Sequence, residues 1–190
     1  MAEPGAAWAY NTVAYAVLHR VLRAATGRSL RDFSAAALFA PVGATATWRA
    51  RADPGGHAEQ GLVASARDLC RLGLLVLAGG RWNHRRLLPG RWCTAMLSRS
   101  QDLNHSYGRL WWLNGQDSHL LPDDDRPRPG PLLHAAPDDL VAGLGAGGQK
   151  LYVVPSRGLV VVRLGDAPGG GRTGFDNDLW TALAAALPKD

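Results

Sequence analysis

The chain has 190 residues, a length that suits one domain or one domain with an added lobe, and 46% of its residues are apolar, as in ordinary globular proteins. Its net charge of +5 comes almost wholly from arginine, since Lys150 and Lys189 are the only lysines. The arginines are spread out beside aspartates and form no basic stripe, which argues against a nucleic-acid partner. No run of about 18 apolar residues predicts a membrane segment, and residues 1–7 lack the basic and apolar regions of a secretory signal.

Helical patterns dominate the first half of the chain. Apolar residues recur at helical spacing over Thr12–Ala25, and Gly27 should end this helix. The segment Ser29-Leu-Arg-Asp32 has capping-box spacing and predicts a second helix to about Ala40. Residues 44–61 combine glycine, proline and mixed charge, and therefore predict a loop.

Two further helices follow this loop. The segment Ser65-Ala-Arg-Asp68 repeats the capping signature, and the apolar stripe after it stops at Gly79-Gly80. Pro89 suits the first turn of a last helix in this region, which should reach Leu97.

The helical spacing of apolar residues ends at about residue 98, and strand-like segments follow it. Tyr107–Leu113 is short and aromatic-rich and predicts a strand, while the polar, proline-rich residues 114–137 predict a loop or lid. Gln149–Pro155 and Gly158–Leu164 are β-branched runs around a turn, which predict a β-hairpin.

A final helix should run to Leu187, capped by Asp176 or Asn177. Helices segregated from antiparallel strands indicate an α+β fold. We expect a helical lobe at residues 1–106, and a strand, loop, β-hairpin and C-terminal helix at residues 107–190. Two or three strands make a thin sheet that needs further partners, so the sequence predicts an incomplete fold.

One tyrosine has a notable position. Tyr10 directly precedes the first predicted helix, so its phenol would lie near the positive end of the helix dipole, which favours the phenolate. A tyrosine with a lowered pKa can act as a general base. The same pattern also fits an ordinary core tyrosine at a helix start, and the residues alone leave both interpretations open.

Several short motifs occur along the chain in a set order. They are Pro4-Gly5, Tyr10-Asn11-Thr12, Thr26-Gly27, Leu38-Phe39-Ala40-Pro41-Val42-Gly43, Gly61-Leu62, Ser65-Ala66-Arg67-Asp68-Leu69, Gly80-Arg81-Trp82, Leu88-Pro89, Tyr107-Gly108, Trp111-Trp112, Gly145-Ala146-Gly147-Gly148-Gln149 and Leu151-Tyr152-Val153-Val154-Pro155. In this order and spacing the chain resembles the serine hydrolases of the β-lactamase and penicillin-binding-protein family. The esterases and 6-aminohexanoate-oligomer hydrolases are its most similar branch.

The resemblance implies a partial β-lactamase/transpeptidase-like fold: a helical lobe, antiparallel strands and a C-terminal helix, without the N-terminal strands and the nucleophile helix. It also implies hydrolysis of a small ester or amide substrate through an acyl-enzyme, with no cofactor and no metal. Tyr10 would be the proton shuttle, and the backbone N–H of Ala146, on a strand at residues 145–149, would be one oxyanion donor. The substrate-binding residues would be Thr12, Trp111, Trp112, Gly145, Gly147, Gly148 and Gln149. Because neighbouring side chains of a strand point to opposite faces, at most one of the two tryptophans should line a cleft.

Three departures from the family pattern matter. Thr12 stands where the family more often has asparagine, and the Lys-Thr-Gly of β-lactamases is absent from the last motif. No serine is followed three residues later by lysine, although a Ser-x-x-Lys helix supplies the nucleophile in the family. In the family this helix precedes the tyrosine motif, so it would lie before Met1. We therefore expect either a chain completed by a missing N-terminal half, or a degenerate, non-catalytic homologue that binds ligands or partners.

Other catalytic centres are less well supported. Ser65, His57 and Asp68 could form a Ser-His-Asp triad, but Asp68 is better explained as the capping partner of Ser65. The six histidines show no metal-ligand spacing.

Overall fold

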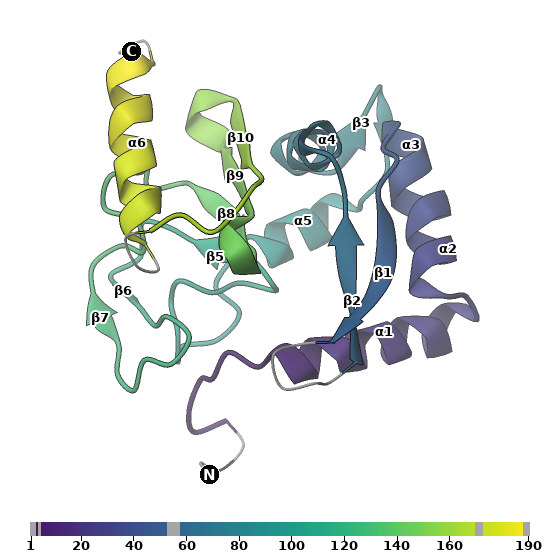
Figure 1. Cartoon of the computed structure of the whole chain (residues 1–190), viewed down its shortest axis with the longest axis horizontal. Helices are drawn as coiled ribbons and strands as arrows, with labels where there is room; N and C mark the ends of the chain where they lie inside the picture. Colours follow the sequence, from purple (N-terminus) through teal and green to yellow (C-terminus); the bar gives the residue numbers. More distant parts are fainter. Residues whose placement is uncertain (1–2, 4, 53–57, 170–172, 188–190) are drawn as a thin grey trace.

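The computed structural model describes residues 3, 5–52, 58–169 and 173–187, and shows a mixture of helices and antiparallel strands (Figure 1). The helices are α1 (Thr12–Thr26), α2 (Leu30–Ser34), the π-helical turn η1 (Ala35–Phe39), α3 (Ala40–Val42), α4 (Ala66–Leu77), α5 (Gly90–Met96), the 3-10 turns η2 (Ala146–Gly148) and η3 (Pro155–Arg157), and α6 (Gly174–Ala186). The strands are β1 (Thr47–Ala52), β2 (Ala58–Val63), β3 (Arg81–Trp82), β4 (Arg85–Arg86), β5 (Trp112–Leu113), β6 (Ser118–His119), β7 (Arg128–Pro129), β8 (Val141–Leu144), β9 (Lys150–Val154) and β10 (Leu159–Arg163). The predicted α+β class is confirmed.

The predicted helix boundaries of the first half are largely confirmed, because local capping chemistry sets them. The side chain of Asn11 accepts a hydrogen bond from the Ala14 N–H at the start of α1, and Gly27 ends the helix in a left-handed conformation. Ser29 caps α2 in the same way, and the helical run continues through η1 and α3 until Gly43. Ser65 and Asp68 form the predicted capping box of α4.

The predicted loop at residues 44–61 is wrong, since β1 and β2 form an antiparallel pair there, with Thr47 opposite Val63. The connecting residues 53–57 lie outside the described residues. Strand β1 is held against α2 because the Trp48 indole N–H donates to the Ser34 hydroxyl oxygen at 2.8 Å. A pairing of this kind depends on contacts across the chain that glycine and proline content does not reveal.

The predicted strand at Tyr107–Leu113 is also mostly wrong. The chain turns back on itself, with the Gly108 N–H donating to the Trp111 carbonyl at 2.8 Å, and only the last two residues form β5. Tyr107 and Trp112 face each other in an isolated antiparallel bridge.

The central sheet has four antiparallel strands in the order β10-β9-β8-β5. The predicted hairpin is confirmed as β9 and β10, joined by η3 with Gly158 in the left-handed conformation. Strand β8 was not predicted from the sequence; it pairs with β9 on one side and with β5 on the other. Its four residues are too few, and include a glycine, to give a β pattern of their own.

Helices cover both faces of this sheet, and Figure 1 shows α6 on one side of β9 and β10 and α4 on the other. Tyr152 and Val154 belong to the same core cluster as Trp180 of α6, whereas Val153 packs with Val76 of α4, as the alternation of a strand requires. Helix α4 lies so close to the sheet that a Cβ on its Gly73 would stand 2.5 Å from the Cγ1 atom of Val160. Because α4 packs on the sheet, the division of the chain near residue 106 stays a prediction.

A buried charge pair joins α6 to the sheet. The ammonium of Lys150 lies 3.0 Å from a carboxylate oxygen of Asp176, and the hydroxyl of Tyr152 donates to the same carboxylate. The side chain of Asp176 is only 1% exposed. The prediction that Asp176 or Asn177 caps the last helix is therefore wrong: α6 begins after Thr173, and the Asp176 side chain points into the core. Sequence spacing alone could not reveal its partners on β9.

We expect Asp176→Asn to destabilise the protein by about 3–5 kcal/mol, because it leaves the buried Lys150 ammonium without a counter-charge. Urea unfolding measures the change. Asp178→Asn is the matched control, since Asp178 is exposed on the same helix. Equal unfolding midpoints for the two variants would show that the pair does not hold α6 to the sheet.

Candidate active site

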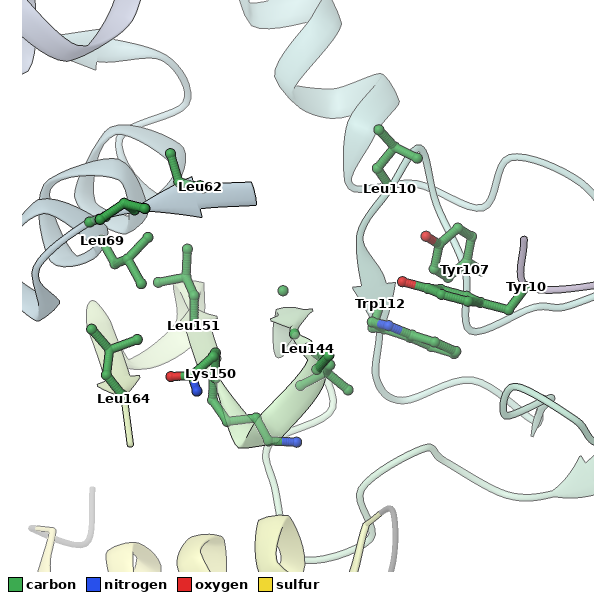
Figure 2. Close-up of a pocket in the computed structure, with 16 residues that line it drawn as sticks. Tyr10, Leu62, Leu69, Tyr107, Leu110, Trp112, Leu144, Lys150, Leu151 and Leu164 are labelled. Atoms are coloured by element: carbon green, nitrogen blue, oxygen red, sulfur yellow. The ribbon is translucent and has the colours of Figure 1, made fainter. Parts of the chain in front are cut away.

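A cavity of about 600 Å³ opens beside the end of the β8–β9 hairpin (Figure 2). Three groups of residues line it: the aromatic side chains of Tyr10, Tyr107 and Trp112; residues at the end of the β8–β9 hairpin; and leucine and valine side chains from several elements. The full set is Tyr10, Leu62, Val63, Ala64, Leu69, Tyr107, Leu110, Trp112, Gly143, Leu144, Gly145, Ala146, Gln149, Lys150, Leu151 and Leu164. A concave, largely apolar site of this size is typical of small-molecule binding.

The cavity brings together five of the nine predicted site residues, namely Tyr10, Trp112, Gly145, Ala146 and Gln149. The other four, Thr12, Trp111, Gly147 and Gly148, are not among the residues that line it. Trp112 packs in the core cluster that contains Tyr152 and Trp180, whereas Trp111 packs against the cluster under α4. Only Trp112 of the two lines this cavity, which agrees with the expectation that at most one of them would.

Aromatic rings fix the position of Tyr10. Its ring stacks on Trp112 with an interplanar angle of 12° and a centroid separation of 6.1 Å. It also meets Tyr107 and Tyr15 edge-on, and the hydroxyl oxygens of these two tyrosines lie 2.7 Å apart. Tyr107 was not predicted as a site residue, although it stands in the Tyr-Gly segment before the two tryptophans. Figure 2 shows the Tyr10 and Tyr107 hydroxyls at the same side of the cavity.

The expectation of a lowered pKa for Tyr10 is wrong for the chain as it stands. Burial, and then the neighbouring Tyr15 phenol, raise its pKa to about 12. Burial likewise raises the pKa of Tyr107 to about 12 and the pKa of Tyr15 well above its ordinary range. Tyr10, Tyr15 and Tyr107 share one partly buried space, and burial is the largest cause that raises the pKa of each phenol. At neutral pH Tyr10 therefore carries its proton.

The predicted strand at residues 145–149 is a tight turn instead. The Gly145 N–H donates to the Gln149 carbonyl at 2.8 Å, and the turn η2 lies between them. Gly147 and Gly148 have φ angles of 69° and 81°, and a Cβ on Gly148 would lie 2.6 Å from Pro168. These two glycines are therefore needed for the shape of the turn. Ala146 opens η2, and an N–H at the first position of a helical turn has no acceptor within that turn.

Gln149 holds the turn in place. Its side-chain nitrogen donates to the Gly165 carbonyl at 2.8 Å and to the Gly147 carbonyl at 3.2 Å. In return, the Gly165 N–H donates to the Gln149 side-chain oxygen at 3.1 Å. The amide group thus ties η2 to the end of β10, and direct contact of Gln149 with a substrate stays a prediction.

Asp68 caps helix α4 together with Ser65, as its position in the sequence predicted. Its carboxylate accepts hydrogen bonds from the hydroxyl and the N–H of Ser65, at 2.7 and 3.1 Å, and from the Thr45 N–H at 3.1 Å. The hydrogen bonds from Ser65 hold the pKa of Asp68 below its ordinary range. This geometry is that of a helix cap, and His57 of the alternative triad lies outside the described residues.

Pro4 also lies outside the described residues, so the Pro-Gly turn before Tyr10 is described only from Gly5 onwards. Among the residues that the structure describes, no cluster of His, Cys, Asp or Glu side chains could hold a metal ion. Within the same residues, no helix is both long and apolar enough to cross a membrane.

Comparison with known proteins agrees with this geometry. The family model described as Beta-lactamase matches residues 1–186. A solved structure named as a 6-aminohexanoate-dimer hydrolase from Bacillus anthracis superimposes on 100% of the chain with a TM-score of 0.70 and 24% sequence identity. Another, named as a β-lactamase from Bacteroides dorei DSM 17855, superimposes on 98% of the chain with a TM-score of 0.72 and 16% identity. The chain spans 47% and 60% of these two proteins. No curated protein sequence matches it.

The raised phenol pKa values predict a loss of stability at alkaline pH. An unfolded tyrosine ionises near pH 10, whereas Tyr10 and Tyr107 ionise near pH 12 in the folded chain. Between these values the unfolded state binds fewer protons, so the free energy of unfolding is undiminished below about pH 10 and falls as the pH rises towards 12. Denaturant unfolding at a series of pH values measures this slope. The double variant Tyr10→Phe/Tyr107→Phe should have a shallower slope, and an unchanged slope contradicts the assignment.

Proposed function

The chain belongs to the β-lactamase family, and on that premise we propose that it forms part of a serine hydrolase that cleaves an ester or amide through an acyl-enzyme. Tyr10 is the proton-transfer group in this proposal, and the backbone N–H of Ala146 is one oxyanion donor. The observation that carries the proposal is that Tyr10 and Ala146, which lie far apart in the sequence, line one cavity.

The proposed reaction has two steps. A serine oxygen attacks the carbonyl carbon and loses its proton, and the carbonyl oxygen becomes an oxyanion that accepts a hydrogen bond from the Ala146 N–H. The oxyanion collapses, the bond between the carbonyl carbon and the leaving group breaks, the leaving group takes the serine proton through the Tyr10 hydroxyl, and the acyl-enzyme remains. Water then attacks the acyl carbon, its proton passes through the same group to the serine oxygen as the ester bond to serine breaks, and the acid and the free serine are released.

Tyr10 needs a cation beside it to act as a base. With a pKa of about 12 it holds its proton at neutral pH and can only donate. A neighbouring ammonium would favour the phenolate and lower this pKa. Lys150 lines the cavity, but its ammonium is paired with Asp176. In the proposal the Lys of a Ser-x-x-Lys segment supplies this cation together with the nucleophile.

The Ser-x-x-Lys segment would come from outside these 190 residues, because no serine in them has lysine three positions later. Helix α1 supports the existence of a partner segment. It has no buried residue, and Val13, Val17, Leu18 and Val21 are each 43% to 57% exposed. An apolar helix face of this kind ordinarily packs against another element. We propose that the missing half covers this face.

The absence of Ser-x-x-Lys also favours a second candidate function, in which the chain is a non-catalytic homologue that binds ligands or partners. The two candidates differ in what happens when the nucleophile segment is supplied. A catalytic part gains activity, whereas a degenerate homologue does not.

By itself, the purified chain should not hydrolyse nitrocefin or a short p-nitrophenyl ester faster than its Tyr10→Phe variant, because it lacks the nucleophile motif. Absorbance assays of both proteins provide the measurement. Stoichiometric acylation of any serine by a fluorophosphonate or penicillin probe, seen by mass spectrometry, would contradict this expectation.

Mixing the chain with the N-terminal part of a family hydrolase that carries Ser-x-x-Lys should produce esterase activity that neither part has alone. In the mixture, Tyr10→Phe should lower the rate about 10²-fold or more, as expected for a lost acid–base group. Ala146→Pro should lower it about 10²–10³-fold, since proline removes the proposed oxyanion donor. A complemented site that is unaffected by Tyr10→Phe refutes the assigned role of Tyr10.

The structure allows a clean control for each variant. Proline fits at Ala146, the first residue of η2, and the preceding Gly145 has φ −88° and ψ 156°, which a residue before proline can adopt. Ala146→Gly keeps the N–H and should keep the activity. Ser65→Ala removes only a helix cap and should leave the rate unchanged. A loss of activity in Ser65→Ala with none in Tyr10→Phe would restore the triad interpretation.

A further inference from the structure

We propose that Arg163 is a positioning residue, which holds the turn η2 in the conformation that presents the Ala146 N–H to the cavity. The meaning of this role for catalysis rests on the proposed function, in which that N–H is an oxyanion donor. The hold on the turn depends on contacts within the chain itself, so it is testable with and without an added nucleophile segment.

Arg163 is the last residue of β10 and stands opposite Lys150 in the β9–β10 register. Residues opposite each other in an antiparallel pair project from the same face of the sheet, and Lys150 reaches Asp176 of α6 on that face. The Arg163 guanidinium lies there too, 5.2 Å from the centre of the Phe175 ring. Arg163 is not among the residues that line the cavity. Its influence on the proposed site therefore passes through the backbone that it holds.

The guanidinium of Arg163 donates hydrogen bonds to three backbone carbonyl groups. Its Nη1 donates to the Gly148 carbonyl at 3.0 Å and to the Gly165 carbonyl at 3.1 Å, and its Nη2 donates to the Asp166 carbonyl. Gly148 is the last residue of η2, whereas Gly165 and Asp166 follow the end of β10. One planar side chain thus bridges the turn and the segment beside it. A lysine ammonium is a compact point charge and cannot span these acceptors in the same way.

The two residues that follow Ala146 are both fixed by side chains. Gln149 donates to the Gly147 carbonyl at 3.2 Å, and Arg163 donates to the Gly148 carbonyl. The guanidinium also packs directly on the turn, since a Cβ added to Gly148 would stand 2.8 Å from Nη1. With the next two carbonyl groups held in place, the Ala146 N–H has a fixed direction. An oxyanion donor is effective only when its direction is set before the reaction.

Amide hydrogen exchange of the chain, without an added segment, tests the hold on the turn. Arg163→Lys keeps a positive charge beside Phe175 but removes the planar fork. The Gly145 N–H donates to the Gln149 carbonyl across η2 at 2.8 Å. In the variant it should exchange about tenfold faster, as expected when a hydrogen bond that resists local opening is lost. The Gly158 N–H, in the turn before β10, should keep its exchange rate and is the internal control.

The complemented hydrolase tests the meaning of this hold for catalysis. Arg163→Lys should lower kcat about tenfold and leave KM within about twofold, because a misdirected donor weakens transition-state binding. In the Ala146→Pro background the donor is already absent, so Arg163→Lys should cost less than about twofold. A merely structural loss would lower the rate equally in both backgrounds. Arg128→Lys is the matched control, since Arg128 makes a fork with Asp124 away from the turn, and it should leave kcat and KM unchanged.

An unchanged exchange rate at Gly145, or an equal acceleration at Gly158, overturns the proposal. A loss of rate that persists in the Ala146→Pro background, or one that appears in KM, overturns it as well. Failure of the proposed function is distinguishable from these results. If the mixture never hydrolyses an ester, the catalytic proposal fails, and the exchange rates by themselves decide whether Arg163 holds the turn.

Discussion

The buried pair of Lys150 and Asp176 is the constraint on which the sheet region depends. Each charge is too costly to bury alone, so β9 and α6 must meet where the ammonium and the carboxylate come within 3.0 Å. Tyr152, two residues along the same strand, donates to the same carboxylate and fixes the register of α6 over that face. Helix α4 packs on the other face of β9, and it comes close to the sheet because residue 73 is glycine.

This arrangement also shapes the cavity. Lys150 is the first residue of β9, so the turn that carries Ala146 is anchored directly beside the buried pair. The amide of Gln149 secures the turn from the opposite side through Gly165. Because Lys150, the one lysine among the residues that the structure describes, is paired with Asp176 in the core, the cavity keeps a mostly apolar lining. Lys150, whose charge is used in the core, and the lysine proposed to act beside Tyr10 must therefore be different residues.

The aromatic cluster connects the start of the chain with the sheet. Tyr10 stacks on Trp112, and Tyr15 and Tyr107 share a hydrogen bond, so α1 is joined to the cavity through its first turn. One face of α1 packs against α2, β1 and β2, and its His19 ring meets Trp48, whereas the opposite face presents valine and leucine to solvent. A helix with one uncovered apolar face agrees with a chain that spans about half of the solved proteins it resembles. An added segment that carries a cation would cover this face of α1 and would lower the raised pKa values of the phenols.

The sequence by itself determined the features whose chemistry is local: the caps at Asn11, Ser29 and Ser65, the β9–β10 hairpin around Gly158, and the order of motifs that identified the family. These depend on residues within a few positions of one another, so their spacing is readable. The tertiary structure decided the β1–β2 pairing, the partnership of Asp176 with Lys150, and the high pKa of Tyr10, since each depends on side chains that only folding brings together. Residues 145–149 show the difference: the sequence predicted a strand there, but the close packing of Gly148 against Pro168 and the hydrogen bonds of Gln149 with Gly165 make the segment a turn that lines a cavity.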